Sequence, residues 1–306
     1  MANYTWPNNA RLALSLVVNV EEGSEYSTKD GDRKMEPVDE LQVHVAKPLR
    51  NYGNESNYQY GLKEGAPRII NLLDKYQIPV TWAAAALSLE RAPELTQAIR
   101  RRKDEVCAHG YRWVHQFNMD KDSEAQFIQQ ATESIEQTIG KRPQGWLSRY
   151  LLTDNTRDLL RQSGYLYHMD DYSADAPFYA DGDSNSMVIM PYAIDSNDMK
   201  MWVAPSYTPD AWLKYAKDSF DTLYQEGAEQ PRMMSLGLHL RIIGRPGRIW
   251  ALQAFLDYVT SKTDVWCATR EQIARHFIEQ SAPPKTNQSG QFEQHPVTSH
   301  CTPASN

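Results

Sequence analysis

The fold class is decided by ten residues near the N-terminus, RLALSLVVNV from Arg11 to Val20. They are aliphatic or β-branched almost without interruption, as is typical of a strand that is buried on both faces. Such strands belong to parallel sheets covered by helices. We therefore interpret this stretch as the first strand of an α/β protein.

Short apolar runs of the same kind recur along the chain and alternate with helical patterns. The predicted strands are residues 11–20, 79–84, 105–108, 145–148, 166–169, 187–191, 234–239 and 265–268. The predicted helices are residues 66–76, 87–102, 122–139, 154–163, 209–226, 246–261 and 270–278. This alternation favours a parallel sheet, either closed as a barrel or doubly wound. Seven or eight units favour an irregular (β/α) barrel, and no glycine-rich dinucleotide fingerprint follows the first strand.

The length of 306 residues, 41% of them apolar, allows one large core. We predict a single barrel domain over residues 1–280. Residues 22–61 form a long polar insertion after the first strand, which is expected to act as a lid or as a contact between subunits. Residues 281–306 are rich in Pro, Gln, Ser and Thr, and they predict a disordered tail.

Charge and composition narrow the possible partners and the compartment. The net charge is −7, and the dense basic run Arg100–Lys103 is followed at once by two acidic residues, so no nucleic-acid partner is expected. No apolar run approaches the roughly 18–20 residues that span a membrane. Residues 1–9 lack the apolar core of a signal peptide, and the three cysteines suit a reducing compartment. We expect a cytoplasmic protein without a membrane partner.

Polar side chains gather at the ends of the predicted strands, where a parallel barrel carries its chemistry. Alone, each has an ordinary explanation, such as a solvated loop, a helix cap or a hydrogen-bonded core histidine. Their convergence is the strongest functional signal in the chain and predicts an active site. These residues are Asn19, Glu21 and Glu22, then His109 and Trp113, then Ser148 and Arg149, then His168 and Asp170, and finally His239 and Arg241.

Several side chains near these strand ends are predicted to contact a substrate. Arg241 and Arg245 lie in an arginine-rich turn after His239, where guanidinium groups could hold a carboxylate or a ureido group. Trp113 and Trp146 lie at strand ends and are expected to line the pocket. Asp170 is a further candidate, with a helix cap or turn as its alternative, and Arg149 could instead pair with an acidic loop.

Together these pieces resemble the NodB-type polysaccharide deacetylase superfamily. More narrowly, they are similar to its branch of metal-independent allantoinases and cyclic imide hydrolases. The resemblance extends from about Trp6 to Glu279. The matching pieces, in chain order, are NVEEG (19–23), AHGYRW (108–113), GW (145–146), DSNDM (195–199) and SLGLHLRIIGRPGR (235–248).

The resemblance implies roles for individual residues. Glu21 matches the catalytic base and Glu22 the metal-binding acid. His109 matches the first metal histidine, Arg149 the arginine of the site, and His239 the general acid. The proline that follows the family's arginine is absent from this chain.

The implied metal site is incomplete. The family's second metal histidine falls on Trp113, which cannot bind a metal. A catalytic zinc site usually has three protein ligands. Glu22 and His109 supply two, and His115 does not have the family's spacing for a third. We expect no tightly bound metal or other cofactor, with zinc as the alternative.

The predicted reaction is hydrolysis of a C–N bond in a small, cyclic, non-peptide amide such as a ureide, hydantoin or imide. Glu21 takes a proton from water and His239 protonates the leaving nitrogen. The oxyanion is held by backbone N–H groups, by Arg149 or by a metal. Glu22 is expected to raise the pKa of Glu21 by repulsion. The alternatives are an N-deacetylase of a polysaccharide or amino sugar and a non-catalytic barrel. The relatives resemble homo-oligomers, which we also expect here.

Overall fold

The computed structural model describes residues 4–40, 47, 49–180, 187–192 and 194–281. The strands are β1 (Leu12–Val20), β2 (Val80–Ala84), β3 (Glu105–Ala108), β4 (Gly145–Trp146), β5 (Tyr167–His168), β6 (Phe178–Tyr179), β7 (Val188–Ile189), β8 (Arg232–His239) and β9 (Val265–Cys267). They form one sheet in the order β6-β7-β5-β4-β3-β2-β1-β8, and β9 pairs with β1. The predicted strands all have a counterpart, and β6, which was not predicted, pairs antiparallel with β7.

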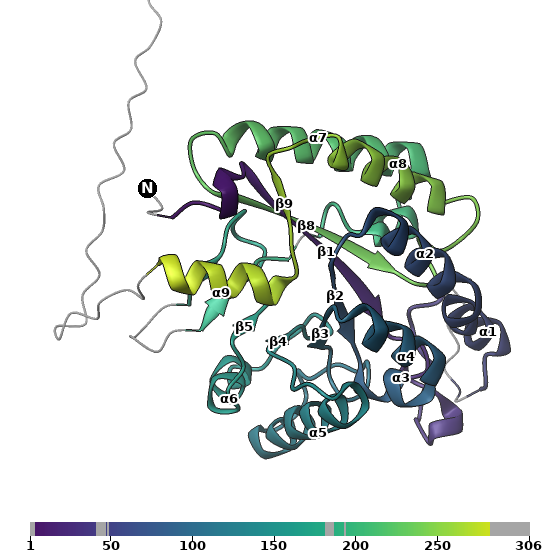
Figure 1. Cartoon of the computed structure of the whole chain (residues 1–306). Coiled ribbons are helices and arrows are strands. Elements are labelled where there is room, and N and C mark those ends of the chain that lie inside the picture. Colours follow the sequence, from purple (N-terminus) through teal and green to yellow (C-terminus); the bar gives the residue numbers. More distant parts are fainter. Residues whose placement is uncertain (1–3, 41–46, 48, 181–186, 193, 282–306) are drawn as a thin grey trace, which may run out of the picture.

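The strand β1 organises the sheet because it has neighbours along both of its sides. On one side β8 follows it in parallel from Leu12 to Asn19. On the other side β9 pairs with the beginning of β1 and β2 pairs with its end, from Leu16 to Val20. The described path of the sheet ends at β6 and β8. The curled parallel sheet surrounded by helices confirms the predicted irregular (β/α) barrel (Figure 1).

Helices lie around the outside of the strands in Figure 1. They are α1 (Tyr52–Tyr60), α2 (Ala66–Tyr76), α3 (Ala86–Arg91), α4 (Pro93–Arg102), α5 (Lys121–Ile139), α6 (Thr156–Gln162), α7 (Pro209–Glu226), α8 (Ile249–Thr260) and α9 (Arg270–Gln280). Short helical turns are η1 (Pro7–Asn9), η2 (Thr28–Asp30), η3 (Gly61–Gly65) and η4 (Asp198–Met201). The helix predicted over residues 87–102 is in fact two, because Pro93 lacks an N–H and begins a new helix.

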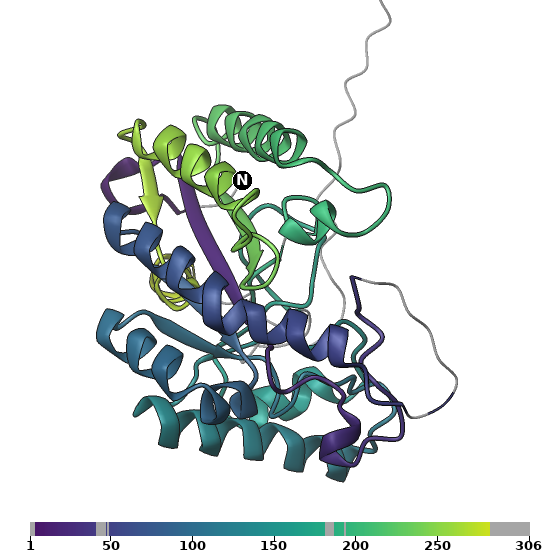
Figure 2. The same cartoon turned by 90° about the vertical axis from the view of Figure 1, so that its right-hand side faces the viewer.

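The insertion after β1 contains a helix that was not predicted. α1 begins after Asn51, whose side chain accepts a hydrogen bond from the backbone N–H of Asn54 at 3.0 Å. The π-helical turn η3 joins α1 to α2, so that they form one long helix across the molecule (Figure 2). α1 has little apolar periodicity, and its buried residue Tyr58 packs against Trp113 of another loop. Tertiary packing therefore stabilises this helix.

Strand alternation divides the core into two layers. On β1, Leu14, Leu16 and Val18 belong to the cluster packed under the helices, whereas Ala13 and Val17 belong to a cluster with residues of the other strands. Successive side chains of a strand point to opposite faces. Residues an even number of positions away from Ala13 and Val17 therefore face the barrel interior. The residues of the site can be located by the same rule.

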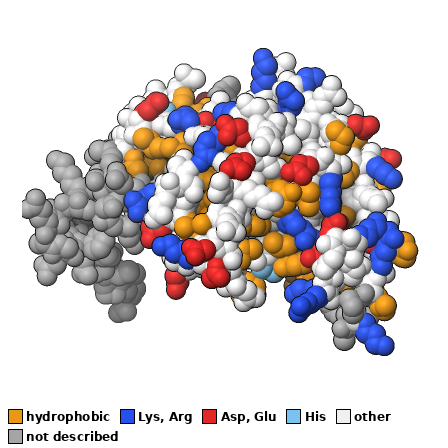
Figure 3. Space-filling view, turned by 90° about the horizontal axis from the view of Figure 1, so that it is seen from below, with side chains coloured by type: hydrophobic (Ala, Val, Ile, Leu, Met, Phe, Trp, Pro, Cys, Tyr) orange, Lys and Arg blue, Asp and Glu red, His pale blue; other side chains and the backbone are white. Residues whose placement is uncertain are grey.

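The surface shows no long single-sign region on the face of Figure 3, where the described acidic and basic side chains are interspersed with apolar ones. Within the described ranges, no helix combines the length and apolarity that crossing a membrane requires. The absence of a nucleic-acid partner and the homo-oligomer stay predictions. The predicted disordered tail from residue 282 onward lies outside the described residues.

Candidate active site

Alternation brings three predicted site residues to the barrel interior. Glu21 directly follows β1 and is four positions after Val17, so its side chain points inward like that of Val17. The side chain of Glu22 points away from the interior. His109 lies two residues after Cys107, which belongs to the interior cluster, so His109 also points inward. His239 ends β8, directly beside Asn19 of β1. The three side chains therefore meet at the carboxyl ends of their strands.

These residues line a small cavity with a volume of about 40 Å³. Strand ends from β1, β3, β4 and β8 contribute to its walls. The lining residues are Asn19, Glu21, His109, Trp113, Leu147, Ser148, Arg149, Tyr150, Tyr172, Tyr192, Ile194, Asn197 and His239.

The carboxylate of Glu21 lies at the centre of this arrangement. Its Oε1 atom is 3.4 Å from Nε2 of His239 and 3.6 Å from Nε2 of His109. Its Oε2 atom accepts a hydrogen bond of 2.8 Å from Arg241. Glu21 is only 2% exposed, so these neighbours, rather than water, determine its charge state.

His239 is held by a carboxylate that was not among the predicted site residues. Its Nδ1 atom lies 2.6 Å from Oδ1 of Asp198, and its backbone N–H donates to Oδ2 of the same residue at 2.8 Å. Asp198 is fully buried and also accepts a hydrogen bond from the N–H of Ile243. An Asp–His pair of this kind fixes the orientation of the imidazole and leaves Nε2 facing the cavity.

His109 is held differently. Its Nδ1 atom is 2.7 Å from the backbone carbonyl of Leu147. A carbonyl oxygen only accepts hydrogen bonds, so Nδ1 carries the proton. Nε2 is then the nitrogen on the side of Glu21.

The charges of the site differ from the prediction. Burial alone would raise the pKa of Glu21, but Arg241 and His239 outweigh it and hold that pKa well below its usual value. The carboxyl group whose pKa is raised is Glu22, mainly through burial. Burial would lower the pKa of His239, but the negative charges of Asp198 and Glu21 raise it to about 9. The expectation that Glu22 raises the pKa of Glu21 is therefore wrong, because the neighbouring cations dominate.

The metal ligands considered from the sequence are not assembled. Within the described ranges, no group of three or more His, Cys, Asp or Glu side chains could hold a metal ion. Glu22 is fully buried on the side of the insertion, where its carboxylate accepts the backbone N–H of Glu21. His115 is bonded through Nδ1 to the carbonyl of Arg149 and does not line the cavity. The residues present therefore do not fit the zinc site that the resemblance implied.

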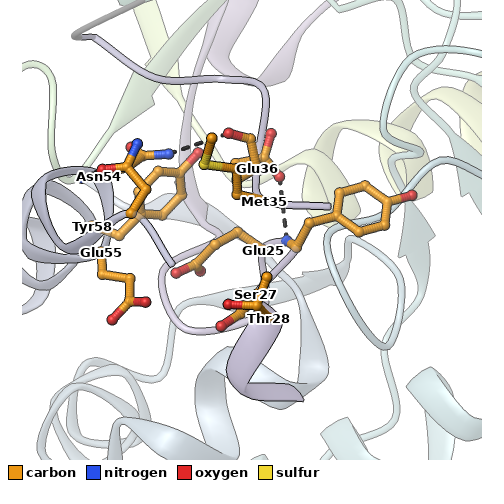
Figure 4. A pocket seen from close by; sticks show the side chains of 10 residues that line it. Glu25, Ser27, Thr28, Met35, Glu36, Asn54, Glu55 and Tyr58 are labelled. Carbon is orange, nitrogen blue, oxygen red and sulfur yellow. Dashed lines mark hydrogen bonds between the residues drawn. The ribbon is translucent and has the colours of Figure 1, made fainter. Parts of the chain in front are cut away.

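Arg149 lines the cavity but is already paired with an acidic residue of the insertion. Its terminal nitrogens lie 2.8 and 2.5 Å from the carboxylate of Glu36, and both side chains are about 1% exposed. Its guanidinium also stacks on the ring of Trp113, 3.6 Å from the ring centroid. The alternative prediction, that Arg149 pairs with an acidic residue of a loop, is therefore correct. Figure 4 shows Glu36 on the loop that follows β1, beside Tyr58 from α1.

Two predicted substrate contacts are corrected on the β4 side. Trp146 is fully buried, packs edge-to-face against Phe127 and Tyr165, and points toward α5 rather than into the cavity. Asp170 accepts the backbone N–H of Ser148 at 2.7 Å and lies 2.7 Å from His168. It supports the cavity wall without lining it. Because Trp146 and Leu147 are consecutive in the chain, their side chains point to opposite faces of the sheet, and it is Leu147 that lines the cavity.

The two arginines of the turn after β8 do not contact the cavity, although both were predicted to bind the substrate. Arg241 is bound to Glu21 and lies behind it, outside the cavity lining. Arg245 stacks on Tyr60 at 3.7 Å and donates to Asn57, so it anchors α1. Because η3 brings the end of α1 over this turn, both guanidinium groups are used to hold the insertion. Trp113, in contrast, lies on the cavity wall as expected.

An apolar rim at the mouth of the cavity was not anticipated. Tyr150, Tyr172 and Ile194 all line it and are 53%, 46% and 53% exposed. Tyr150 has φ = 60°, a left-handed conformation that is uncommon for residues with a side chain. Of the residues that sequence reasoning missed, Asp198 lay within the DSNDM match and could have been found, whereas nothing distinguished Glu36.

Comparisons with known proteins give consistent matches. A family model described as polysaccharide deacetylase matches residues 56–168. A Schizosaccharomyces pombe protein named "Putative polysaccharide deacetylase" is 36% identical over 292 residues, which cover 88% of this chain and 91% of that protein.

Solved structures extend this similarity to the three-dimensional level. PuuE allantoinase is 37% identical, with a TM-score of 0.87 over 91% of this chain and 94% of that chain. A protein described as a probable polysaccharide deacetylase from Pseudomonas aeruginosa PAO1 is 36% identical, with a TM-score of 0.86 over 90% and 93% of the two chains.

Proposed function

The chain belongs to the polysaccharide deacetylase family, and we propose that it hydrolyses a C–N bond of a small cyclic amide such as a ureide, a hydantoin or an imide. The main support is the pair formed by Glu21 and His239, whose facing atoms are 3.4 Å apart in a cavity of about 40 Å³. One group carries a negative charge at neutral pH and the other a proton, which is the combination that amide hydrolysis needs.

In the proposed first step, the carboxylate of Glu21 accepts a proton from a water molecule. The water oxygen bonds to the carbonyl carbon, and the carbonyl electron pair moves to its oxygen. Because the pKa of Glu21 is low, it is a weak base, and the rate gain must come mainly from holding the water in place. Arg149, whose side chain lines the cavity, is the candidate cation beside the oxyanion.

In the second step the C–N bond breaks and its electron pair goes to the nitrogen. His239, charged below about pH 9, donates its Nε2 proton to that nitrogen. Asp198 keeps the imidazole in position and stabilises its charged form. The product is a ring-opened acid, and the proton on Glu21 returns to His239 through solvent.

The aromatic lining of the cavity supports a small planar substrate. A planar ring could lie between the aromatic side chains Trp113, Tyr150 and Tyr172. The alternative, an N-deacetylase of a polysaccharide or amino sugar, is supported by the names of the S. pombe and P. aeruginosa relatives. The same acid and base would serve that reaction.

A substrate panel separates the two functions. Allantoin, dihydrouracil, phthalimide and acetylated chito-oligomers are incubated with the wild type and with Glu21→Gln. Ring opening is followed by chromatography and released acetate by an enzymatic assay. We expect turnover of at least one cyclic amide by the wild type and not by the variant. Release of acetate from the oligomers, without turnover of any cyclic amide, would overturn the proposal in favour of the deacetylase.

A further inference from the structure

Two consecutive carboxylates are buried at the end of β1. Glu21 is 2% exposed and Glu22 is fully buried, with its Oε2 atom accepting the N–H of Glu21 at 3.1 Å. Burying two carboxylates side by side is unfavourable unless a positive charge compensates them. In hydrolases with such a pair, a divalent metal ion is one way to supply that charge.

One guanidinium group contacts both carboxylates here. Nη1 of Arg241 lies 2.8 Å from Oε2 of Glu21 and 3.4 Å from Oε1 of Glu22. The side chain is only 2% exposed. A guanidinium does not lose its proton in proteins, so this charge is permanent.

The insertion holds Arg241 in this place. The guanidinium lies over the ring of Tyr58, 4.4 Å from its centroid, and 5.5 Å from that of Trp113. At Gly61 a Cβ would lie 2.5 Å from Oε1 of Glu22 and 3.1 Å from the backbone nitrogen of Arg241. A side chain at this position would therefore displace the carboxylate of Glu22 or the backbone at Arg241.

We propose that Arg241 is the built-in cation of this site, which neutralises Glu21 and Glu22, directs the free oxygen of Glu21 between the two histidines, and keeps divalent metal ions out. Arg241 is a positioning residue, because it acts through Glu21 and does not line the cavity. The inference rests on the proposed function only for the role of Glu21. The absence of an assembled metal group among the described residues agrees with it.

The test uses zinc binding without any substrate, so its outcome is independent of the proposed function. Wild type, Arg241→Met, Arg241→Lys and the double variant Arg241→Met/Glu22→Gln are purified without added metal and dialysed against Zn²⁺. Bound zinc is measured by elemental analysis and affinity by calorimetry. The matched control is Arg245→Met, which also removes an arginine stacked on a tyrosine but touches no carboxylate.

We expect Arg241→Met to bind zinc about tenfold more tightly than the wild type, or better, because Glu21 and Glu22 lose the positive charge that touches both of them. Arg241→Lys, the double variant and Arg245→Met should bind no more zinc than the wild type. Stoichiometric zinc in the wild type, or a folded Arg241→Met that gains no affinity, would overturn the inference. If Arg241→Met does not fold, recovery of folding by Glu22→Gln supports neutralisation, and failure to recover contradicts it.

Discussion

The ends of β3 and β8 place two histidines on opposite sides of one carboxylate, at nearly the same distance. Nε2 of His109 is 3.6 Å and Nε2 of His239 is 3.4 Å from Oε1 of Glu21. The two regions differ in what lies behind the ring. The Nδ1 atom of His109 meets the uncharged carbonyl of Leu147, whereas that of His239 meets the carboxylate of Asp198.

This difference separates the functions of two side chains that are alike in sequence context. A carboxylate stabilises the charged imidazolium, and together with Glu21 it raises the pKa of His239 to about 9. A carbonyl partner fixes which nitrogen is protonated but adds no net charge. The β8 histidine is therefore prepared to donate a proton, and the β3 histidine has no charged partner of this kind.

The largest effect is expected from removing the proposed acid or base. His239→Asn and Glu21→Gln should each lower kcat by about a hundredfold or more, since each removes one proton-transfer group. Steady-state kinetics on the substrate found by the panel measures this, and circular dichroism checks folding. Near-wild-type turnover in both variants would contradict the assignment of these roles.

Replacing Asp198 should leave His239, like His109, without a charged partner at Nδ1. In the wild type, kcat is expected to fall as the pH rises past about 9, where His239 loses its proton. Asp198→Asn keeps the shape but removes the charge, so this descending limb should move to lower pH and kcat at neutral pH should fall by about tenfold. An unchanged pH profile would show that Asp198 does not control the proton of His239.

The same pair makes a contribution to stability with a defined pH range. The folded pKa of His239, about 9, lies above its ordinary value of 6.5. The stabilisation is therefore complete below about pH 6.5 and is lost as the pH rises through about 9. Urea unfolding at pH 6, 8 and 10 should show this loss in the wild type, and a smaller one in Asp198→Asn.

A smaller effect is expected on the β3 side. His109→Asn retains a donor for the carbonyl of Leu147 and removes the nitrogen that faces Glu21. We expect a loss in kcat of roughly tenfold or less, because the proposed acid and the proposed base both remain. Comparison with His239→Asn under identical conditions is the measurement, and an equal or larger loss would reverse the roles of the two histidines.

The smallest effect is expected for the neighbouring histidine of the β3 loop. His115 is bonded to the carbonyl of Arg149 and lies outside the cavity lining. His115→Gln should leave kcat unchanged within error and lower the free energy of unfolding by about 1 kcal/mol, the usual contribution of one hydrogen bond. A large loss of activity together with loss of bound zinc would restore His115 as a metal ligand.

Much of the fold could be predicted because it rests on local patterns. Every predicted strand exists, since a strand buried on both faces is apolar along its length. The helix α1 was missed because its residues are mostly polar and it is stabilised by Tyr58 packing on a distant loop. The strand β6, Phe178–Tyr179, was missed because it is only half-buried and pairs antiparallel with β7, outside the alternation of parallel strands and helices.

The sequence predicted which residues of the candidate site face inward, but not the partners with which they pair. Glu21, His109, Trp113, Arg149 and His239 all line the cavity. Trp146 was assigned to the pocket from its place at a strand end, although alternation directs its neighbour Leu147 into the cavity instead.

The sequence by itself determined the parallel barrel and which strand ends carry the reactive groups, because period-two alternation and apolar runs are properties of neighbouring residues. Only the tertiary structure decided what each group is paired with. Asp198 and His239 are 41 positions apart, and Glu36 and Arg149 are 113 apart. Buried charges are controlled by neighbours within a few ångströms. The direction of each pKa shift, and the capture of Arg241 and Arg149 by carboxylates, therefore follow from the folded chain alone.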